Sequence, residues 1–315
     1  MKPLSARAML ELVLALQALG ALGIGLAVLY WLEASRWTAL AAGLGSVVLV
    51  RAAINANNFR MAARCASPTP EEFRLRPLAS LRLFLEEFAA SMMYSSWHGV
   101  RGVARTRIYP ECMLPPVLLL HGYGCNSGYW RRLLPRLEAA RISHATLDME
   151  PITGDIDGFA RQVEEAVEAL RCASGAGKVI LVGHSMGGLV GRAWMRAYGT
   201  ARLARLITLG SPHAGTGLAA LGIGANARQM RRDGDWLRAL GASETPASRA
   251  LITSIYTHHD NIVSPQTSSE LAGARNLAFG GVGHVALGRN PRVLDAVMDE
   301  IGRCAPVREG VGVSR

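Results

Sequence analysis

The chain has 315 residues, and half of them are hydrophobic, a high share for a purely soluble protein. Its length suits one large or two small domains. The formal net charge of +10 comes mostly from arginine, but no RNA- or DNA-binding motif accompanies it, so nucleic acid is not expected as a partner. We expect a basic surface that faces anionic lipid, unless the arginines reflect only a codon bias.

Two apolar runs lie near the N-terminus. Residues 8–32 are apolar apart from Glu11 and Gln17, and at about 1.5 Å per residue a helix of this length crosses a bilayer. Residues 38–54 form a shorter run with Arg51 near its end, where a long side chain can reach the interface. Aromatic residues cluster at the turn between the runs, as they do at membrane surfaces. We therefore predict a transmembrane helical hairpin within residues 1–58.

The charges that flank this hairpin predict its orientation. Basic residues lie before the first run and after the second, whereas the turn carries only Arg36. The positive-inside rule then places both ends, and the rest of the chain, on the cytoplasmic side of a bacterial inner membrane. Two alternatives stay open, namely a single signal-anchor and a cleaved secretory signal, for which the first run is long.

Residues 59–98 are expected to form a linker and an amphipathic helix. The stretch Pro68 to Glu72 has the composition of a helix start, with acids suited to a first turn. Leucines then recur at helical spacing, and Glu86 and Glu87 fall on the other side. This helix either packs on its own domain or lies in the membrane interface.

Strand-like and helical segments alternate over residues 99–305. Such alternation predicts an α/β domain with a mainly parallel sheet that helices cover on both faces. Functional groups then collect at the carboxyl ends of the strands. Strands are expected at residues 116–120, 145–147, 179–182, 206–209, 252–256 and 277–279, and helices near residues 130–140, 159–171, 189–198 and 291–303. Residues 306–315 are expected to be a disordered tail.

The most informative stretch is Gly183-His184-Ser185-Met186-Gly187, which joins the run at 179–182 directly to a helical pattern. A serine on so sharp a turn requires a strained backbone, and the flanking glycines let the strand and the helix pack closely. The hydroxyl of Ser185 then lies at a helix N-terminus, where the dipole and the amide of Met186 favour an oxyanion. We predict that Ser185 is a nucleophile.

Two downstream loops supply the groups that activate such a serine. Asp260 follows the strand at 252–256, and His284 lies in a glycine-rich loop after the strand at 277–279. Because a serine hydroxyl is weakly acidic, His284 must take its proton, while Asp260 orients the imidazole. Upstream, Tyr123 follows His121-Gly122 at the end of the strand at 116–120. The backbone amides of Tyr123 and Met186 would hold the oxyanion.

These motifs resemble the α/β-hydrolase superfamily, in which serine, acid and histidine follow one another along the chain. The stretch Gly183 to Gly188, the segment at 207–216 and the loop around His284 are similar to those of bacterial lipases and esterases. The resemblance covers about residues 115–303. It implies hydrolysis of acyl lipids or other esters by Ser185, Asp260 and His284. An acyltransferase or thioesterase with the same triad, and a non-catalytic membrane scaffold, remain as alternatives.

Other residues could take some of these roles. Asp148 or Asp155 is an alternative acid, and His213 is an alternative base. We expect His184 and His121 to be packed or bracing side chains. His258 and His259 lack the further ligands that a metal site needs, so neither metal nor cofactor is expected.

Residues 212–249 are inserted between two strands and contain an amphipathic stretch at 230–240, so we predict a small helical lid there. The five cysteines have no disulfide-framework spacing, and reduced thiols are expected. Acyl-lipid substrate and membrane lipids are the expected partners, whereas the oligomeric state cannot be predicted.

Overall fold

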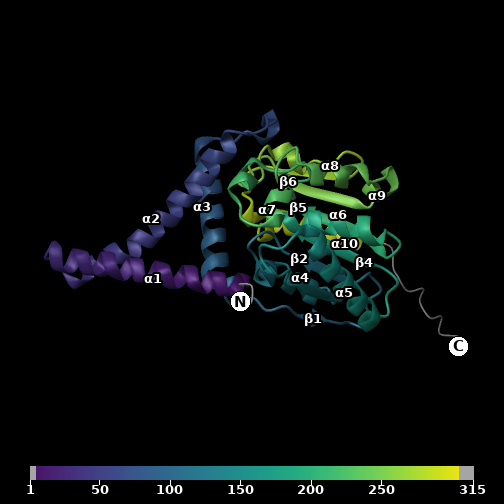
Figure 1. Ribbon diagram of the computed structural model, residues 1–315, viewed down its shortest axis with the longest axis horizontal. Helices are drawn as coiled ribbons and strands as arrows, with labels where there is room; N and C mark the ends of the chain where they lie inside the picture. The colour runs from purple at the N-terminus through teal and green to yellow at the C-terminus, as the bar shows by residue number, and fades with distance from the viewer. Residues whose placement is uncertain (1–4, 305–315) are drawn as a thin grey trace.

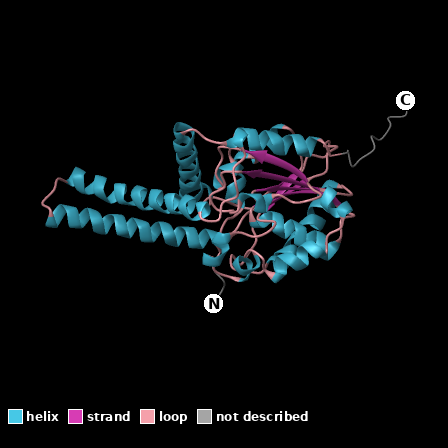
Figure 2. Cartoon of the chain, turned by 90° about the horizontal axis from the view of Figure 1, so that it is seen from above, coloured by secondary structure: helices cyan, strands magenta, loops and turns pink. Residues whose placement is uncertain are grey.

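Two long antiparallel helices project from an α/β domain (Figures 1 and 2). The computed structural model describes residues 5–304, so the tail expected at 306–315 lies outside the described residues. Helix α1 spans Ala6–Trp31 and helix α2 spans Arg36–Ala63, and each is capped by a serine, Ser5 or Ser35. The predicted helical hairpin is therefore confirmed as a pair of apolar helices.

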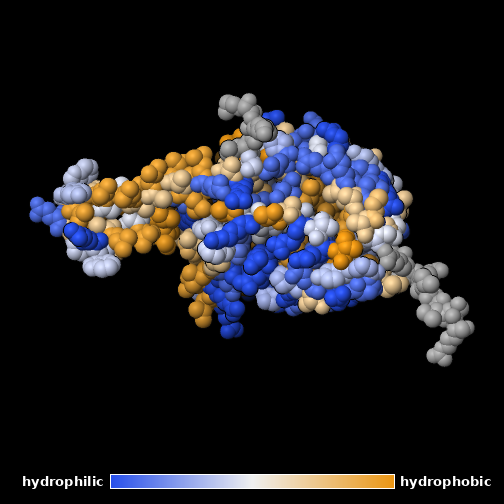
Figure 3. Space-filling model, turned by 90° about the horizontal axis from the view of Figure 1, so that it is seen from below, coloured by the Kyte–Doolittle hydropathy of each residue, from blue (hydrophilic) through white to orange (hydrophobic). Residues whose placement is uncertain are grey.

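Small residues bring the two helices of the hairpin close together. A Cβ added at Gly43 would lie 2.5 Å from the carbonyl oxygen of Ala21, so only glycine allows this approach. Apolar side chains cover the outside of the hairpin, as the space-filling view shows (Figure 3). By length and composition, both helices are able to cross a membrane.

Helix α2 continues past residue 54, where its apolar run ends, to Ala63. Asn55 explains the extension, since it is buried and its side chain donates to the carbonyl of Phe84 in the following helix. Arg51 does not extend freely toward the interface. Its guanidinium binds Gln17 of α1, with 3.0 Å from Nε to Oε1, and the hydroxyl of Ser95 at 3.1 Å.

In the segment after α2 the helix begins later than predicted. The expected helix start at Pro68 to Glu72 is wrong, because the stretch there forms only the short turn η1 (Glu71–Phe73). Helix α3 (Pro77–Met93) begins at a proline, and the residue before a proline disfavours a helical backbone. A second short helix, η2 (Tyr94–His98), follows.

The buried face of α3 is not its leucine-rich face. Leu83, Glu87 and Ala90 are buried, whereas Leu81 is 54% and Leu85 is 52% exposed. Glu87 does lie on the side opposite these leucines, as expected, but that side is the one that packs on the domain. Helix α3 stands between the hairpin and the α/β domain (Figure 1), which it contacts through Glu87.

Seven strands form one sheet in the order β1-β3-β2-β4-β5-β6-β7. Neighbouring strands are parallel except for β1, which runs antiparallel to β3. The six predicted strands are present, while β1 is short, exposed and without an apolar pattern that could predict it. The strands are β1 Thr106–Arg107, β2 Val117–Leu120, β3 His144–Leu147, β4 Val179–His184, β5 Leu203–Leu209, β6 Ile252–Thr257 and β7 Arg275–Phe279.

Helices cover both faces of this sheet, as predicted. Helices α5 (Ile156–Ser174) and α6 (Met186–Tyr198) pack on one face, and α4 (Leu134–Ala139) and α10 (Pro291–Gly302) pack on the other. Alternate strand residues enter the two cores, so Leu118 and Leu119 of β2 belong to opposite faces. The segment expected as one helix at 130–140 is divided into η3 (Ser127–Arg132) and α4.

Several short helices make up the insertion between β5 and β6. They are η4 (Gly217–Leu221), α7 (Ala225–Gln229), α8 (Asp235–Ala242) and α9 (Pro246–Ala250). Two further short helices, η5 (Gln266–Ser269) and η6 (Val285–Gly288), follow β6 and β7. The small helical insertion is thus present within residues 212–249, although the stretch at 230–240 contains a turn before α8 begins.

Candidate active site

Ser185 lies on the turn between β4 and α6. Its φ of 54° and ψ of −121° are strained for a residue with a side chain, and such strain persists only where the surroundings impose it. The Ser185 amide donates to the carbonyl of Leu209 on β5 at 2.8 Å, and its carbonyl accepts from Gly188 at 3.1 Å. These bonds hold the serine at the N-terminus of α6.

The glycines around Ser185 are required by close packing. A Cβ at Gly183 would lie 2.5 Å from the carbonyl carbon of Gly187. A Cβ at Gly187 would lie 2.3 Å from the carbonyl oxygen of Leu120 on β2. Real Cβ atoms do not approach so closely, so the strand, the turn and the helix can meet only with glycine at both positions.

His284 and Asp260 form a buried pair. Nδ1 of His284 lies 2.8 Å from Oδ2 of Asp260, and the two residues are 4% and 3% exposed. The other carboxylate oxygen, Oδ1, accepts from the amides of Ile262 and Val263 at 2.8 Å and 2.7 Å. Because Oδ2 of Asp260 accepts a hydrogen bond from Nδ1, the imidazole carries its proton there and leaves Nε2 as a proton acceptor.

This pair lies beside the serine turn. A Cβ added at Gly210, the residue after Leu209 on β5, would lie 3.1 Å from Oδ2 of Asp260 and 3.3 Å from Nδ1 of His284. The ring centroids of His184 and His284 are 4.6 Å apart, and Ser185 follows His184 directly. The structure therefore brings Ser185, Asp260 and His284 to the same carboxyl edge of the sheet.

Opposing effects act on the pKa of His284. Burial is the largest and lowers it, but the charge of Asp260, the hydrogen bond to it and the charge of Glu87 together raise the pKa above the usual value. Burial and the nearby His284 hold the pKa of His184 well below its usual value. His184 is therefore neutral, stacks on Tyr129 with centroids 4.0 Å apart, and contacts the carbonyl of His284 through Nε2 at 3.2 Å.

The loop that carries Tyr123 also approaches the serine. A Cβ at Gly122 would lie 3.1 Å from Cβ of Ser185. His121 braces this loop, since its Nδ1 donates to the carbonyl of Gly122 and its Nε2 accepts from the amide of Met149, both at 2.9 Å. The amide of Met186 is in the first position of α6, where it has no acceptor within the helix.

The side chain of Tyr123 has a role that the sequence did not indicate. Its hydroxyl donates to the carbonyl of Ile223 at 2.8 Å and accepts from the amide of Ile223 at 3.0 Å. Ile223 lies in the insertion and is 74% exposed. The loop that carries Tyr123 and the insertion between β5 and β6 are therefore directly connected.

The alternative acids and bases have other partners. Asp148 accepts from the amide of Ser127 at 2.6 Å, and Asp155 caps α5 by accepting from Gly158 at 2.7 Å. His213 is buried beside Thr208, with 3.1 Å between Nε2 and the hydroxyl oxygen. His258 packs on Phe73, and His259 accepts from the amide of Gly281. No cluster of metal-binding side chains occurs within residues 5–304, and the cysteines are free.

Glu87 is a site residue that the sequence analysis missed. Its carboxylate accepts from the amides of Val285 and Ala286 at 3.0 Å and 2.9 Å, directly after His284. It is 1% exposed, and burial raises its pKa while the two amide hydrogen bonds oppose that rise. The sequence shows only that Glu87 shares a helix face with Leu83 and Ala90, and the structure shows that this face is buried.

The loop that carries Asp260 is also attached to the N-terminal region. The amide of Ser67, in the linker after α2, donates to Oε1 of Gln266 at 3.1 Å. Nε2 of the same Gln266 donates to the carbonyl of Asp260 at 2.9 Å. Nearby, the hydroxyl of Ser264 donates to the carbonyl of Ala62 at 2.6 Å. The N-terminal region therefore contacts both loops that hold the Asp260–His284 pair.

Comparisons with known proteins identify the fold. The family described as the alpha/beta hydrolase fold matches residues 115–233. The mature lipase BlEst2 of Bacillus licheniformis superposes with a TM-score of 0.56 at 17% identity, over 63% of this chain and 97% of that structure. Lipase B of Aspergillus fumigatus gives a TM-score of 0.53 at 19% identity, over 64% and 55%. The chain therefore has the α/β-hydrolase fold.

Curated relatives match a shorter part of the chain. The 1-acylglycerol-3-phosphate O-acyltransferase ABHD5 of Sus scrofa is 33% identical over 141 residues, which cover 42% of this chain and 38% of that protein. A triacylglycerol lipase of Pseudarthrobacter phenanthrenivorans is 31% identical over 109 residues, which cover 32% of this chain and 34% of the lipase. The chain thus spans little more than a third of the length of either relative.

Proposed function

We propose that this protein is a membrane-anchored serine hydrolase that cleaves carboxylic esters of acyl lipids. Ser185 is the nucleophile, His284 the general base and acid, and Asp260 the residue that orients the imidazole. The observation that carries the proposal is the buried contact of 2.8 Å between His284 and Asp260, at the sheet edge where Ser185 occupies a strained turn. The lipases with the same fold and the similar triacylglycerol lipase support it.

The reaction follows from these positions. Nε2 of His284 takes the proton of Ser185 as Oγ attacks the ester carbonyl carbon, which becomes a tetrahedral oxyanion. The amides of Tyr123 and Met186 stabilise the negative oxygen, and each such donor contributes about 3 kcal/mol in comparable sites. His284 then protonates the leaving alcohol and an acyl-enzyme remains. A water molecule, activated in turn by His284, releases the carboxylic acid and restores Ser185.

The deciding experiment measures p-nitrophenol release from acetyl through palmitoyl esters by the full-length protein and by Ser185→Ala. We expect hydrolysis by the natural sequence and a loss of about a millionfold in kcat for the variant, as for comparable triads. A fluorophosphonate probe should label the natural protein and not the variant. Equal hydrolysis by the two proteins would reject Ser185 as the nucleophile, whereas no hydrolysis and no labelling would favour a non-catalytic scaffold.

Acyl transfer is a second candidate, because the matched relative from Sus scrofa is named an acyltransferase. A thioesterase with the same triad would form the same acyl-enzyme. The triad does not distinguish these reactions, since only the group that accepts the acyl-enzyme differs. Addition of 1-acylglycerol-3-phosphate to the ester assay tests transfer. If a diacylated product increases while free fatty acid decreases, the main reaction is transfer and not hydrolysis.

The hairpin is proposed to insert into a bacterial inner membrane, with the catalytic domain in the cytoplasm. The support is the length and apolar surface of α1 and α2, together with the basic residues that flank them. A pair of topology reporters fused after residue 64 tests this arrangement. Phosphatase activity of a periplasmic reporter there, in place of fluorescence from a cytoplasmic one, would reject it.

The insertion within residues 212–249 is proposed to act as a lid. It is attached to the oxyanion loop through the hydroxyl of Tyr123, and its exposed Leu221 and Ile223 provide an apolar edge for an acyl chain. Replacing both residues by serine should lower kcat/KM for palmitoyl esters more than for acetyl esters. If kcat/KM depends on acyl-chain length in the same way in both proteins, the lid is excluded.

A further inference from the structure

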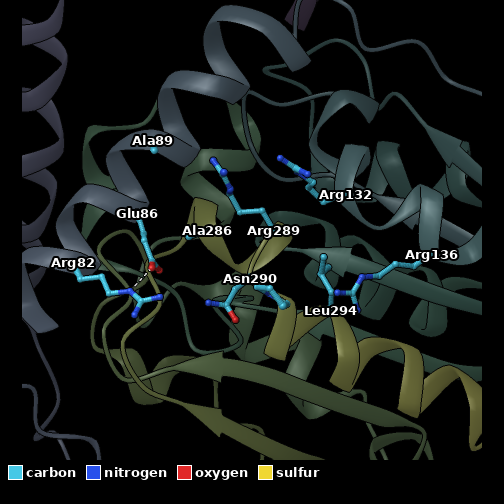
Figure 4. A pocket seen from close by; sticks show the side chains of 10 residues that line it. Arg82, Glu86, Ala89, Arg132, Arg136, Ala286, Arg289, Asn290 and Leu294 are labelled. Carbon is cyan, nitrogen blue, oxygen red and sulfur yellow. Dashed lines mark hydrogen bonds and ion pairs between the residues drawn. The ribbon is translucent and has the colours of Figure 1, made fainter.

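A cavity of about 490 Å³ lies behind the histidine loop, between α3, η3, α4, η6 and α10. It does not contain the proposed nucleophile, although its residue Ala286 lies two positions after His284. Four arginines line it from three directions, together with Glu86 and Asn290 (Figure 4). They are Arg82 on α3, Arg132 on η3, Arg136 on α4 and Arg289 after η6.

Two of these arginines are neutralised by carboxylates and two are not. Arg82 pairs with Glu86 at 2.6 Å, and Arg136 pairs with Asp295. Arg132 forms no ion pair in the described part of the chain. Nη1 of Arg289 is buried and has no hydrogen-bond partner within residues 5–304. Neither guanidinium group is neutralised by a carboxylate within residues 5–304, so the lining of the cavity keeps two positive charges that favour an anion.

The positive field in the cavity has a second source. Helix α10 begins at Pro291, and Asn290, Pro291 and Leu294 line the cavity. The N-terminus of a helix carries a partial positive charge and favours phosphate groups. The pair Arg82–Glu86 adds no net charge, so the two unpaired guanidinium groups and this helix end dominate the field.

An apolar groove adjoins this cavity. It is lined by Leu78, Leu81 and Leu85 on the exposed face of α3, and it shares Arg82, Glu86 and Ala89 with the cavity. Leu78 is 78% exposed and is therefore not part of the hydrophobic core within residues 5–304. A basic cavity next to an exposed leucine face matches a molecule that has an anionic head and apolar tails.

We propose that this composite surface binds one anionic phospholipid, with the phosphate on Arg132 and Arg289 and the acyl chains along Leu78, Leu81 and Leu85. The site relies on the membrane hairpin of the proposed function but not on its chemistry, since it lies outside the Ser185 turn. A bound lipid would hold α3 against the membrane surface and so orient the catalytic domain toward its substrate.

The test uses full-length protein with Ser185→Ala in a neutral detergent, so that no lipid is consumed. Dioleoylphosphatidylglycerol, dioleoylphosphatidylcholine and inorganic phosphate are titrated separately, and the unfolding temperature is followed. Binding to the folded state raises that temperature in a saturable manner. We expect saturation with phosphatidylglycerol and a much weaker response to phosphatidylcholine, whose headgroup has no net charge. Inorganic phosphate at the same concentrations should leave the temperature unchanged, because it lacks the acyl chains.

Matched variants separate this site from a general effect of charge. The double variant Arg132→Gln/Arg289→Gln should raise the half-maximal phosphatidylglycerol concentration by about tenfold or more, since each arginine near an anionic surface contributes substantially to binding. Arg131→Gln removes one positive charge from the same short helix, η3, outside the cavity. It should change the half-maximal phosphatidylglycerol concentration by less than about twofold. Arg132→Gln alone alters an exposed side chain and serves as the variant least able to disturb folding.

Each alternative result overturns the lipid site. An equal response of the double variant and of Arg131→Gln would mean that phosphatidylglycerol binds elsewhere. A response to inorganic phosphate as large as that to phosphatidylglycerol would identify a site for a soluble anion. The ester assay stays separate: an inactive Ser185 would end the proposed function without changing this titration, and a flat titration would leave ester cleavage intact.

Discussion

The apolar side chains of the α/β domain are buried, whereas most of those on the N-terminal helices are exposed. In the domain, strand residues such as Leu119 and Val182 have no exposed surface. In the hairpin, Leu19 is 65% and Leu22 is 59% exposed, so most of its apolar surface has no partner within residues 5–304. The domain therefore has its own core, whereas the hairpin presents its apolar side chains on its outer surface.

The two regions are nevertheless connected at the candidate active site. Glu87 of α3 binds the loop after His284, and Ser67 reaches the loop of Asp260 through Gln266. In a domain that merely carried an anchor, these loops would be supported by the domain alone. The N-terminal region thus combines an apolar hairpin with a structural support of the two loops.

The largest effect is expected inside the domain, at Asp260. Asp260→Asn should lower kcat by about ten thousandfold, because the amide favours the wrong tautomer of His284. The measurement is steady-state hydrolysis of a p-nitrophenyl ester, with circular dichroism to verify folding. A fall of less than tenfold would mean that the carboxylate does not orient a catalytic imidazole.

A pair of leucine substitutions compares the two regions directly. Leu119→Ala removes a side chain with no exposed surface and should lower the free energy of unfolding by about 2–5 kcal/mol. Leu19→Ala removes one that is 65% exposed and should change it by less than about 0.5 kcal/mol in detergent. Urea unfolding followed by tryptophan fluorescence gives both values. Similar losses would show that the hairpin is packed as part of the core.

Glu87→Gln tests the support that α3 gives to the histidine loop. We expect a fall of roughly tenfold in kcat, since a hydrogen-bonded buried charge commonly contributes about 1.5–3 kcal/mol. Glu86→Gln is the matched control, because Glu86 is adjacent and pairs only with exposed Arg82. Equal activity of both variants would leave Glu87 without influence on the reaction.

The pH profile of Glu87→Gln distinguishes positioning from a general loss of structure. The groups that face His284 are Asp260, Glu87 and His184, and the charge of Glu87 raises the pKa of His284. His284 acts as a base only when neutral, so kcat/KM falls as the pH drops below this pKa. Without the charge of Glu87 the pKa is lower, and the acid limb of the profile should move to lower pH. An acid limb that stays in place would contradict this electrostatic coupling.

The smallest effect is expected where the linker meets the acid loop. Ser264→Ala removes one hydrogen bond to the carbonyl of Ala62 and should lower the free energy of unfolding by about 1 kcal/mol. Activity should fall by less than about threefold, because Asp260 keeps its amide donors from Ile262 and Val263. Kinetics and urea unfolding on the same preparation check both values. A larger loss of activity than of stability would mean that this contact acts directly on Asp260.

Local patterns were sufficient for most of the domain. Six strands and the serine turn could be predicted, since apolar runs, glycine spacing and strand ends are properties of neighbouring residues. The residues Ser185, Asp260, His284, Tyr123 and Met186 follow from their places after strands. By contrast, β1 has only two exposed residues, and the helix start at Pro68 to Glu72 was wrong because Pro77 sets the true beginning of α3.

The sequence by itself determined the α/β class, the apolar hairpin and the residue types of the candidate triad, because each depends on composition or on short-range spacing. Only the tertiary structure decided that the buried face of α3 is the one with Glu87, and that its leucines lie beside four arginines. These arrangements depend on contacts between residues that are far apart along the chain, such as Glu87 and Ala286. Periodicity reveals that a helix has two faces, but which face is buried depends on the surface against which the helix packs.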